Sequence, residues 1–152
     1  MDPRHGPAHP FTETAHSGFG VLVQPIVHVQ LRADTSHDWS IQIAAIVDTG
    51  ASITLIQRPY LGYVAGLDAG QLGPPVHFAS ATGTATCRAA RVDLRIGLPP
   101  QPGELLLSQR TVYFTDASLP RPILLGQRGV LDALQLVHTN CGPHPSFRLN
   151  LR

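Results

Sequence analysis

The sequence predicts a mostly β domain of short strands with one short helix. Three observations support this prediction. Several short runs are rich in β-branched residues and alternate between apolar and polar positions, which is the pattern of half-buried strands. These runs are separated by many of the 14 glycines and 14 prolines, which favour turns and end regular elements. Residues 127–135 place their apolar side chains at helical spacing.

Length, charge and apolar runs restrict the class of protein. A chain of 152 residues is long enough for one domain with its own core. Its net charge of +1 argues against a dedicated nucleic-acid or anionic-membrane binder. No apolar run approaches the ~18 residues of a membrane span, and no apolar stretch of a secretory signal follows Met1. We therefore expect a soluble cytoplasmic protein without a membrane or nucleic-acid partner; secretion after removal of a leader is the alternative.

The chain is expected to begin with a tail that leads into strands. Residues 1–18 contain three prolines and few aliphatic residues, which predicts a flexible N-terminal tail before a domain at 19–152. Residues 21–31 are β-branched, and Pro25 restricts its position to a strand start, an edge or a bulge. The alternating run at 40–47 predicts a strand with one face made of Ile41, Ile43, Ala45 and Val47.

A hairpin, further strands and the helix complete the domain. Residues 76–96 predict a β-hairpin with Gly83 at its tip. Alternation in its second arm places Arg91, Asp93 and Arg95 on a solvent-exposed face. The other predicted elements are strands at 52–57, 105–114, 123–126 and 147–151, an irregular stretch at 60–75 with room for one helical turn, and the helix at 127–135.

The segment with the most chemical content is Asp48-Thr49-Gly50-Ala51-Ser52. Asp48 directly follows an apolar strand, where a carboxylate is costly unless it is hydrogen-bonded or partly protonated. Gly50 permits a tight turn, and the Thr49 hydroxyl can bond a neighbouring chain. The segment resembles the aspartic proteases, whose hallmark is two hydrophobic residues followed by Asp-Thr-Gly-Ala-Ser. Because Asp-Thr-Gly also forms ordinary strand-end turns, the rest of the chain decides between these interpretations.

The order of the other elements resembles the retropepsin-like (retroviral-type) aspartic proteases, in particular their cellular and bacterial members. An early strand, a hairpin in the position of the flap, an apolar-apolar-Gly loop, a helix and a C-terminal strand follow in the family's order, at residues 24–29, 76–96, 123–126, 127–136 and 147–151. The resemblance covers residues 19–151. It implies an acid-protease half-barrel with a flap hairpin and one short C-terminal helix, assembled as a C2 homodimer.

The resemblance implies an aspartic endopeptidase, and carboxylate chemistry explains why two copies are needed. One carboxylate takes a proton from water while a second gives a proton to the carbonyl oxygen of the peptide. Asp-Thr-Gly occurs once in the chain. The similar sequences at Asp34 and Asp116 lack both the glycine and the preceding apolar strand. We therefore expect Asp48 of a second copy to complete the site. The substrate would be an extended peptide or protein, with no cofactor and no metal.

The resemblance also implies roles for individual residues. Asp48 would be catalytic, Thr49 would interlock with its mate, and Gly50 would present backbone to the substrate. Ala51 and Ser52 would line the site, with Leu125 and Gly126 packed beneath the loop. The flap would consist of Ala79, Ser80, Ala81, Thr82, Gly83 and Thr84. The sequence departs from the viral pattern at Ser52 and Gln127, where Asp and Arg are usual, and in having a single glycine in the flap.

Other functions have less support in the sequence. The main alternative is a catalytically weak retropepsin-like module for dimerisation or peptide binding. His5 and His9 have the spacing of helical metal ligands, but Pro7 between them prevents a helix. Cys141 and His144 have no matching second pair for a zinc site. Two cysteines are too few for a disulfide framework, so we expect free thiols, and neither a Gly-x-Ser-x-Gly nor a phosphate-binding glycine motif occurs.

Overall fold

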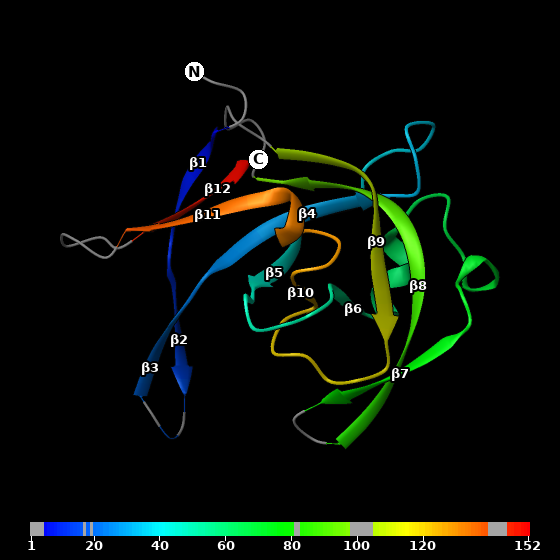
Figure 1. Ribbon diagram of the computed structural model, residues 1–152, viewed down its shortest axis with the longest axis horizontal. Helices are drawn as coiled ribbons and strands as arrows, with labels where there is room; N and C mark the ends of the chain where they lie inside the picture. Colours follow the sequence, from blue (N-terminus) through cyan, green and yellow to red (C-terminus); the bar gives the residue numbers. More distant parts are fainter. Residues whose placement is uncertain (1–4, 17, 19, 81–82, 98–104, 140–145) are drawn as a thin grey trace.

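The computed structural model describes residues 5–16, 18, 20–80, 83–97, 105–139 and 146–152. Within these residues the chain is mostly β, as predicted, with strands in three sheets and short 3₁₀ turns (Figure 1). The largest sheet has seven strands in the order β4-β5-β10-β6-β9-β8-β7. An additional pairing between β4 and β8 bends this sheet into a barrel-like shape. Its strands are β4 (Ile26–Arg32), β5 (Ile43–Val47), β6 (Leu55–Gln57), β7 (Pro75–Ser80), β8 (Gly83–Ile96), β9 (Leu105–Thr115) and β10 (Ile123–Leu125).

The core lies inside the bent sheet and follows the alternation of the strands. On β4, Val27, Val29 and Leu31 are buried while the residues between them are only half-buried. On β5 the buried positions are Ile43, Ala45 and Val47, as predicted. Ile41 was expected on the same face, but the strand begins at Ile43 and the Ile41 side chain is 58% exposed.

Asp93 on β8 is buried, so the prediction of a solvent-exposed face is wrong at this position. The pairing of β8 with β9 shifts register between Val92 and Leu94, and this irregularity turns Asp93 away from solvent. The Asp93 carboxylate accepts a hydrogen bond from Arg32 Nε at 3.1 Å and two from Gln109, from its backbone N–H and its Nε2, both at 3.0 Å. Burial alone raises the pKa of Asp93, but these hydrogen bonds and the Arg32 charge outweigh it and hold the pKa below its usual range.

Two smaller sheets involve the N-terminal residues, where a flexible tail was expected. β1 (His5–Pro10) pairs with β12 (Ser146–Leu151), and β12 pairs with β11 (Leu134–Thr139). β2 (Thr12–His16) pairs with β3 (Gly20–Gln24) and, in blue in Figure 1, projects from the body of the molecule. The prediction of a flexible tail is therefore wrong for the described part of residues 1–18. Prolines hid β1 in the sequence, but an edge strand tolerates proline because one side of it makes no ladder bonds.

The predicted helix at 127–135 is reduced to a single 3₁₀ turn, η3 (Leu131–Ala133). Gly129 has a φ of 102°, which no helix accommodates, and Leu134 already pairs with Leu151 as the first residue of β11. Strand pairing therefore overrides the helical spacing of the apolar residues. The irregular stretch after β6 contains η1 (Arg58–Tyr63) and η2 (Ala69–Gln71). Among the described residues, no helix is long and apolar enough to cross a membrane.

Candidate active site

Asp48 lies at the point where β5 ends, in a loop that a second loop holds in place. β10 runs parallel to β5 and antiparallel to β6, so the chain after β10 passes directly under the Asp48 loop. The Asp48 N–H donates to the carbonyl oxygen of Leu125 at 3.0 Å. The N–H groups of Gln127 and Arg128 donate to the carbonyl oxygens of Ala51 and Ser52, at 2.9 and 3.0 Å. These bonds fix the two loops, residues 48–52 and 125–128, as one unit.

Thr54 supports the second loop, residues 125–128, and was not among the predicted site residues. Its side chain is fully buried. The Thr54 hydroxyl accepts from the Gly126 N–H at 3.1 Å and donates to the Arg128 carbonyl oxygen at 3.1 Å. A polar residue inside the apolar run of 53–56 was the available signal, since a buried hydroxyl requires partners.

The backbone of Ile53 and Ala51 lies so close to Gly126 that a side chain has no room at this position. A Cβ at this position would lie 2.0 Å from the carbonyl oxygen of Ile53 and 3.0 Å from that of Ala51. Glycine is therefore required by close backbone approach beneath the Asp48 loop. Leu125 and Gly126 are both buried.

The Asp48 carboxylate is half-buried and faces a groove. Its Oδ1 accepts a hydrogen bond from the Gly50 N–H at 2.9 Å, which orients the side chain. The groove has a cavity volume of about 660 Å³. It is lined by the Asp48 loop, by β7, by the turn after β9 and by apolar floor residues: Asp48, Gly50, Ala51, Ser52, Ile53, Leu55, Phe78, Ala79, Ala117, Ser118, Leu119 and Leu124.

The structure brings together only some of the predicted site residues. The loop residues Gly50, Ala51 and Ser52 line the groove beside Asp48, and Ala79 does so from the hairpin. Gly83 and Thr84 lie on the hairpin but do not line the groove, the Ser80 side chain is not described, and Ala81 and Thr82 lie outside the described residues. Phe78 and the turn 117–119 were missed, because only the fold brings them to the loop.

Thr49 points to a different hollow from Asp48. This second hollow, of about 270 Å³, is lined by residues that include Thr49, Gln127, Leu131 and Leu136. The Gln127 side chain donates from Nε2 to the Thr49 carbonyl oxygen at 2.9 Å. Gln127, which the sequence marks as a departure from the viral pattern, therefore contributes a neutral hydrogen bond to the loop.

The other acidic side chains considered from the sequence lie away from the groove lining. Asp116 is exposed and pairs with Arg58 at 3.6 Å. Asp34 accepts hydrogen bonds from the Ser36 hydroxyl and the His37 ring, which lower the pKa of that carboxyl to about 2. Within the described part of the chain, Asp48 is therefore the only carboxylate that lines the groove.

Cys87 does not have the surroundings of a nucleophile. It is a free thiol on β8 and is buried. Burial raises the pKa of the Cys87 thiol, which keeps it protonated and unreactive at neutral pH. Cys141, together with His144, lies outside the described residues.

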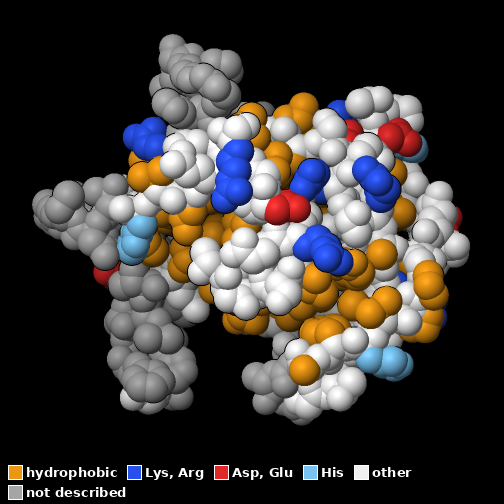
Figure 2. All heavy atoms as spheres, viewed as in Figure 1, with side chains coloured by type: hydrophobic (Ala, Val, Ile, Leu, Met, Phe, Trp, Pro, Cys, Tyr) orange, Lys and Arg blue, Asp and Glu red, His pale blue; other side chains and the backbone are white. Residues whose placement is uncertain are grey.

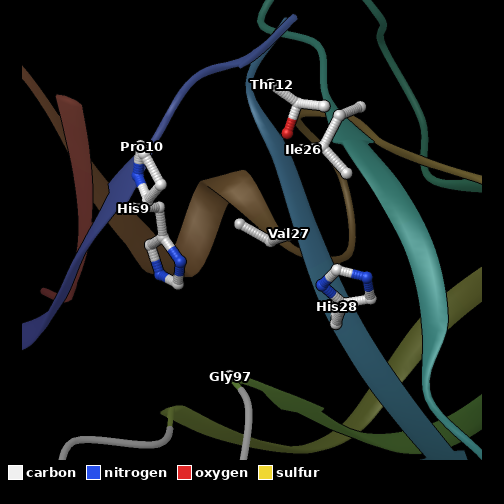
Figure 3. Close-up of a pocket in the computed structure, with 7 residues that line it drawn as sticks. All are labelled: His9, Pro10, Thr12, Ile26, Val27, His28 and Gly97. Atoms are coloured by element: carbon white, nitrogen blue, oxygen red, sulfur yellow. The ribbon is translucent and has the colours of Figure 1, made fainter. Parts of the chain in front are cut away.

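A small apolar pocket of about 140 Å³ separates the N-terminal strand from the barrel. Figure 3 shows the His9 ring projecting from β1 into the space between β1 and β4, where Val27 projects from the other side. The His9 ring stacks on Phe147 with 5.3 Å between ring centroids, and its Nε2 is buried with no hydrogen-bond partner. Burial, then the charge of Arg148 and then His28, lower the pKa of His9.

The fold is similar to that of a solved structure. A crystal structure of a retropepsin-like aspartic protease from Rickettsia conorii is similar to this chain with a TM-score of 0.51 and 16% sequence identity, over 92% of this chain and 98% of that one. The fold is retropepsin-like. No protein-family model and no curated protein sequence matches the chain. In this retropepsin-like fold the Asp48 loop and the β7–β8 hairpin line one groove.

Proposed function

We propose that the chain is an aspartic endopeptidase that acts as a C2 homodimer, with water activated between the Asp48 carboxylates of two subunits. The observation that carries this proposal is the position of Asp48. It is the only described carboxylate in a groove of about 660 Å³, on a loop that is held by backbone hydrogen bonds. A carboxylate fixed in this way is pre-organised for acid–base catalysis.

The dimer follows from the chemistry of two carboxylates. A single carboxylate cannot both accept a proton from water and hold a proton for the peptide carbonyl. Two Asp48 side chains close together would share one proton and titrate as a coupled pair. Beside the loop, Leu136 on β11 is 38% exposed and lines the same hollow as Thr49, so it offers an apolar side chain to a second copy.

The groove suits an extended peptide with apolar side chains. Leu55, Phe78, Leu119 and Leu124 make its walls largely apolar. β7 is the last strand of the seven-stranded sheet, so one side of it is open for strand addition by a substrate. Figure 1 shows the β7–β8 hairpin (green) projecting from the sheet, which fits the role of a flap.

Peptide-library cleavage between pH 4 and 7 tests the proposal with three proteins: the native chain, Asp48→Asn and Asp116→Asn. Asp48→Asn keeps an oxygen that can accept from the Gly50 N–H, so its fold should be retained. We expect it to lose at least ~10²–10⁴-fold in rate. Asp116 is exposed and outside the groove lining, so its variant should cleave like the native chain. Equal cleavage by the native chain and Asp48→Asn would rule out the mechanism. Peptide binding without cleavage by either would indicate a binding module instead.

A further inference from the structure

A polar hollow of about 300 Å³ lies on a face of the molecule that the proposed protease function does not use. It is bounded by β8, β9 and the segment between β10 and β11, and its lining includes Arg91, Arg110 and Arg128. Figure 2 shows blue side chains gathered around a red one on the face that carries β9. Because the chain contains no lysine, every blue side chain is an arginine. We call this feature the arginine hollow.

Two of the three arginines are held in place by the protein itself. Arg91 donates from Nη2 to the Gln109 carbonyl oxygen at 2.7 Å. Arg110 donates from Nε to the Gly129 carbonyl oxygen at 2.6 Å and from Nη2 to Asp132 Oδ1 at 2.7 Å. A guanidinium carries five N–H donors, so each of these side chains keeps donors for a ligand. Their positions are fixed before any ligand arrives, which lowers the entropic cost of binding.

Arg128 supplies a third guanidinium with its hydrogen-bonding capacity intact. Its side chain is exposed and forms no hydrogen bond or ion pair with any described residue. Its backbone, in contrast, is fixed, because its N–H donates to the Ser52 carbonyl oxygen and its carbonyl oxygen accepts from Thr54. A fixed backbone thus presents a free cationic group at the hollow.

The charges that line the hollow are unbalanced. Asp132 is the only carboxylate in the lining, and Arg110 already pairs with it. The positive charges of Arg91 and Arg128 are left without a carboxylate partner among the lining residues. Thr111 and Tyr113 add hydroxyl groups, which can donate to an anion.

We propose that the arginine hollow binds a doubly charged oxyanion of the phosphate-ester class. Guanidinium groups match phosphate oxygens in bidentate geometry, and two uncompensated guanidiniums match two negative charges. The volume of about 300 Å³ exceeds that of a phosphoryl group, so part of the esterified group would enter as well. The bound anion would also restrain residues 126–129, which hold the Asp48 loop by backbone hydrogen bonds.

Thermal unfolding at constant ionic strength tests the proposal without any measurement of protease activity. The probes are inorganic phosphate, pyrophosphate and a short peptide with one phosphoserine, each against the matched chloride buffer. A ligand that binds only the folded chain raises Tm in a saturable way. We expect such a rise for at least one probe. Tightest binding of phosphate or pyrophosphate would indicate a free phosphate compound as the ligand, and tightest binding of the phosphoserine peptide would indicate a phosphorylated polypeptide.

Arg128→Gln is the decisive variant, because its exposed side chain has no partner whose loss would disturb the fold. Its Kd for the bound probe should rise about tenfold or more, since a hydrogen bond to a charged group is lost. Arg58→Gln removes an exposed arginine elsewhere and should leave the Kd unchanged. The absence of a saturable Tm rise with all three probes, or an equal Kd for the two variants, would overturn the proposal.

Discussion

Asp93 and Thr54, in and beside the seven-stranded sheet, differ from His9, in the three-stranded sheet that contains β1, in how their buried polar atoms are hydrogen-bonded. On β8 of the larger sheet, Asp93 accepts three hydrogen bonds, and Thr54, just before β6, both donates to and accepts from the loop at 125–128. In the smaller sheet, the buried Nε2 of His9 has no hydrogen-bond partner, and the ring is held by stacking on Phe147. Asp93 and Thr54 therefore have hydrogen-bond partners, whereas His9 Nε2 has none.

This difference indicates which part of the molecule is built for fixed geometry. A buried polar group with all its partners locks its surroundings, because each lost partner leaves another group unsatisfied. A buried imidazole without a partner is tolerated only while it is neutral. We therefore expect the Asp48 loop to keep its position as pH changes near neutrality and the docking of β1 to weaken in acid.

The largest expected effect in this comparison comes from Asp93→Ala. The substitution leaves the Arg32 guanidinium and the Gln109 N–H without their buried partner, and Gln109 holds a positive φ of 48°. Breaking a buried pair on one side costs about 3–5 kcal/mol of unfolding free energy. Urea unfolding measures this loss. Asp116→Asn, which breaks an exposed ion pair, should cost less than about 1 kcal/mol.

The pH dependence of the Asp93 contribution has a definite sign. Because the folded pKa of Asp93 lies below its ordinary value of 3.8, the folded state holds the proton less tightly than the unfolded state. The stabilisation is complete above pH 3.8 and is lost as the pH falls through the folded pKa. Asp93→Ala should therefore lose less stability relative to the native chain at very low pH than at pH 7. A constant difference would contradict the buried, ionised state of Asp93.

Gly126→Ala should have the next largest effect. The added Cβ would meet the Ile53 carbonyl oxygen at 2.0 Å, so the two loops must separate. We expect a loss of about 3 kcal/mol in unfolding free energy. Gly62→Ala is the matched control, since nothing lies within 4 Å of a Cβ there. If both variants unfold at the same urea concentration, close packing at Gly126 does not hold the Asp48 loop.

His9→Phe should have the smallest effect at neutral pH and the clearest dependence on pH. The pKa of His9 is lowered from 6.5 by burial and by the nearby Arg148 and His28, so the folded state binds fewer protons. The contribution of His9 to stability is complete above pH 6.5, and it falls as the pH drops below 6.5 toward the lower folded pKa.

At pH 7 the free energy of unfolding of His9→Phe should lie within about 0.5 kcal/mol of that of the native chain. As the pH falls from 7 to 5, the variant should become more stable relative to the native chain. Parallel urea unfolding series at several pH values measure this change. His77→Phe replaces an exposed histidine on β7 and serves as the control. A difference that does not change with pH would show that the His9 pocket is no weaker in acid than the rest of the fold.

Much of the seven-stranded sheet could be predicted from sequence because its strands alternate and end at turn residues. The hairpin of β7 and β8, the long β9, and the short β10 all lie where the pattern placed them. The Asp48 loop was equally accessible, since its residues are contiguous. Phe78 was not, because its place in the groove depends on contacts between segments far apart in the chain. For Thr54 the sequence offered only a polar residue in an apolar run, and its hydrogen-bond partners come from a distant segment.

Two errors have a shared physical origin, which is strand pairing that local pattern does not encode. Leu134 continues the helical spacing of residues 127–135 but pairs with Leu151, so the helix stops after one 3₁₀ turn. β1 contains prolines and little apolar surface, yet it pairs with β12. Asp93 was misplaced because a shift of register inside a strand cannot be read from alternation.

A mixed-subunit titration tests the proposed shared site most directly. Native chain and Asp48→Asn are mixed in varying proportions at constant total concentration, allowed to exchange subunits, and assayed for peptide cleavage. If each active site needs Asp48 from both copies, activity follows the square of the native fraction, and an equal mixture keeps about one quarter of the activity. Activity in direct proportion to the native fraction would mean that one Asp48 suffices, and would contradict the two-carboxylate mechanism.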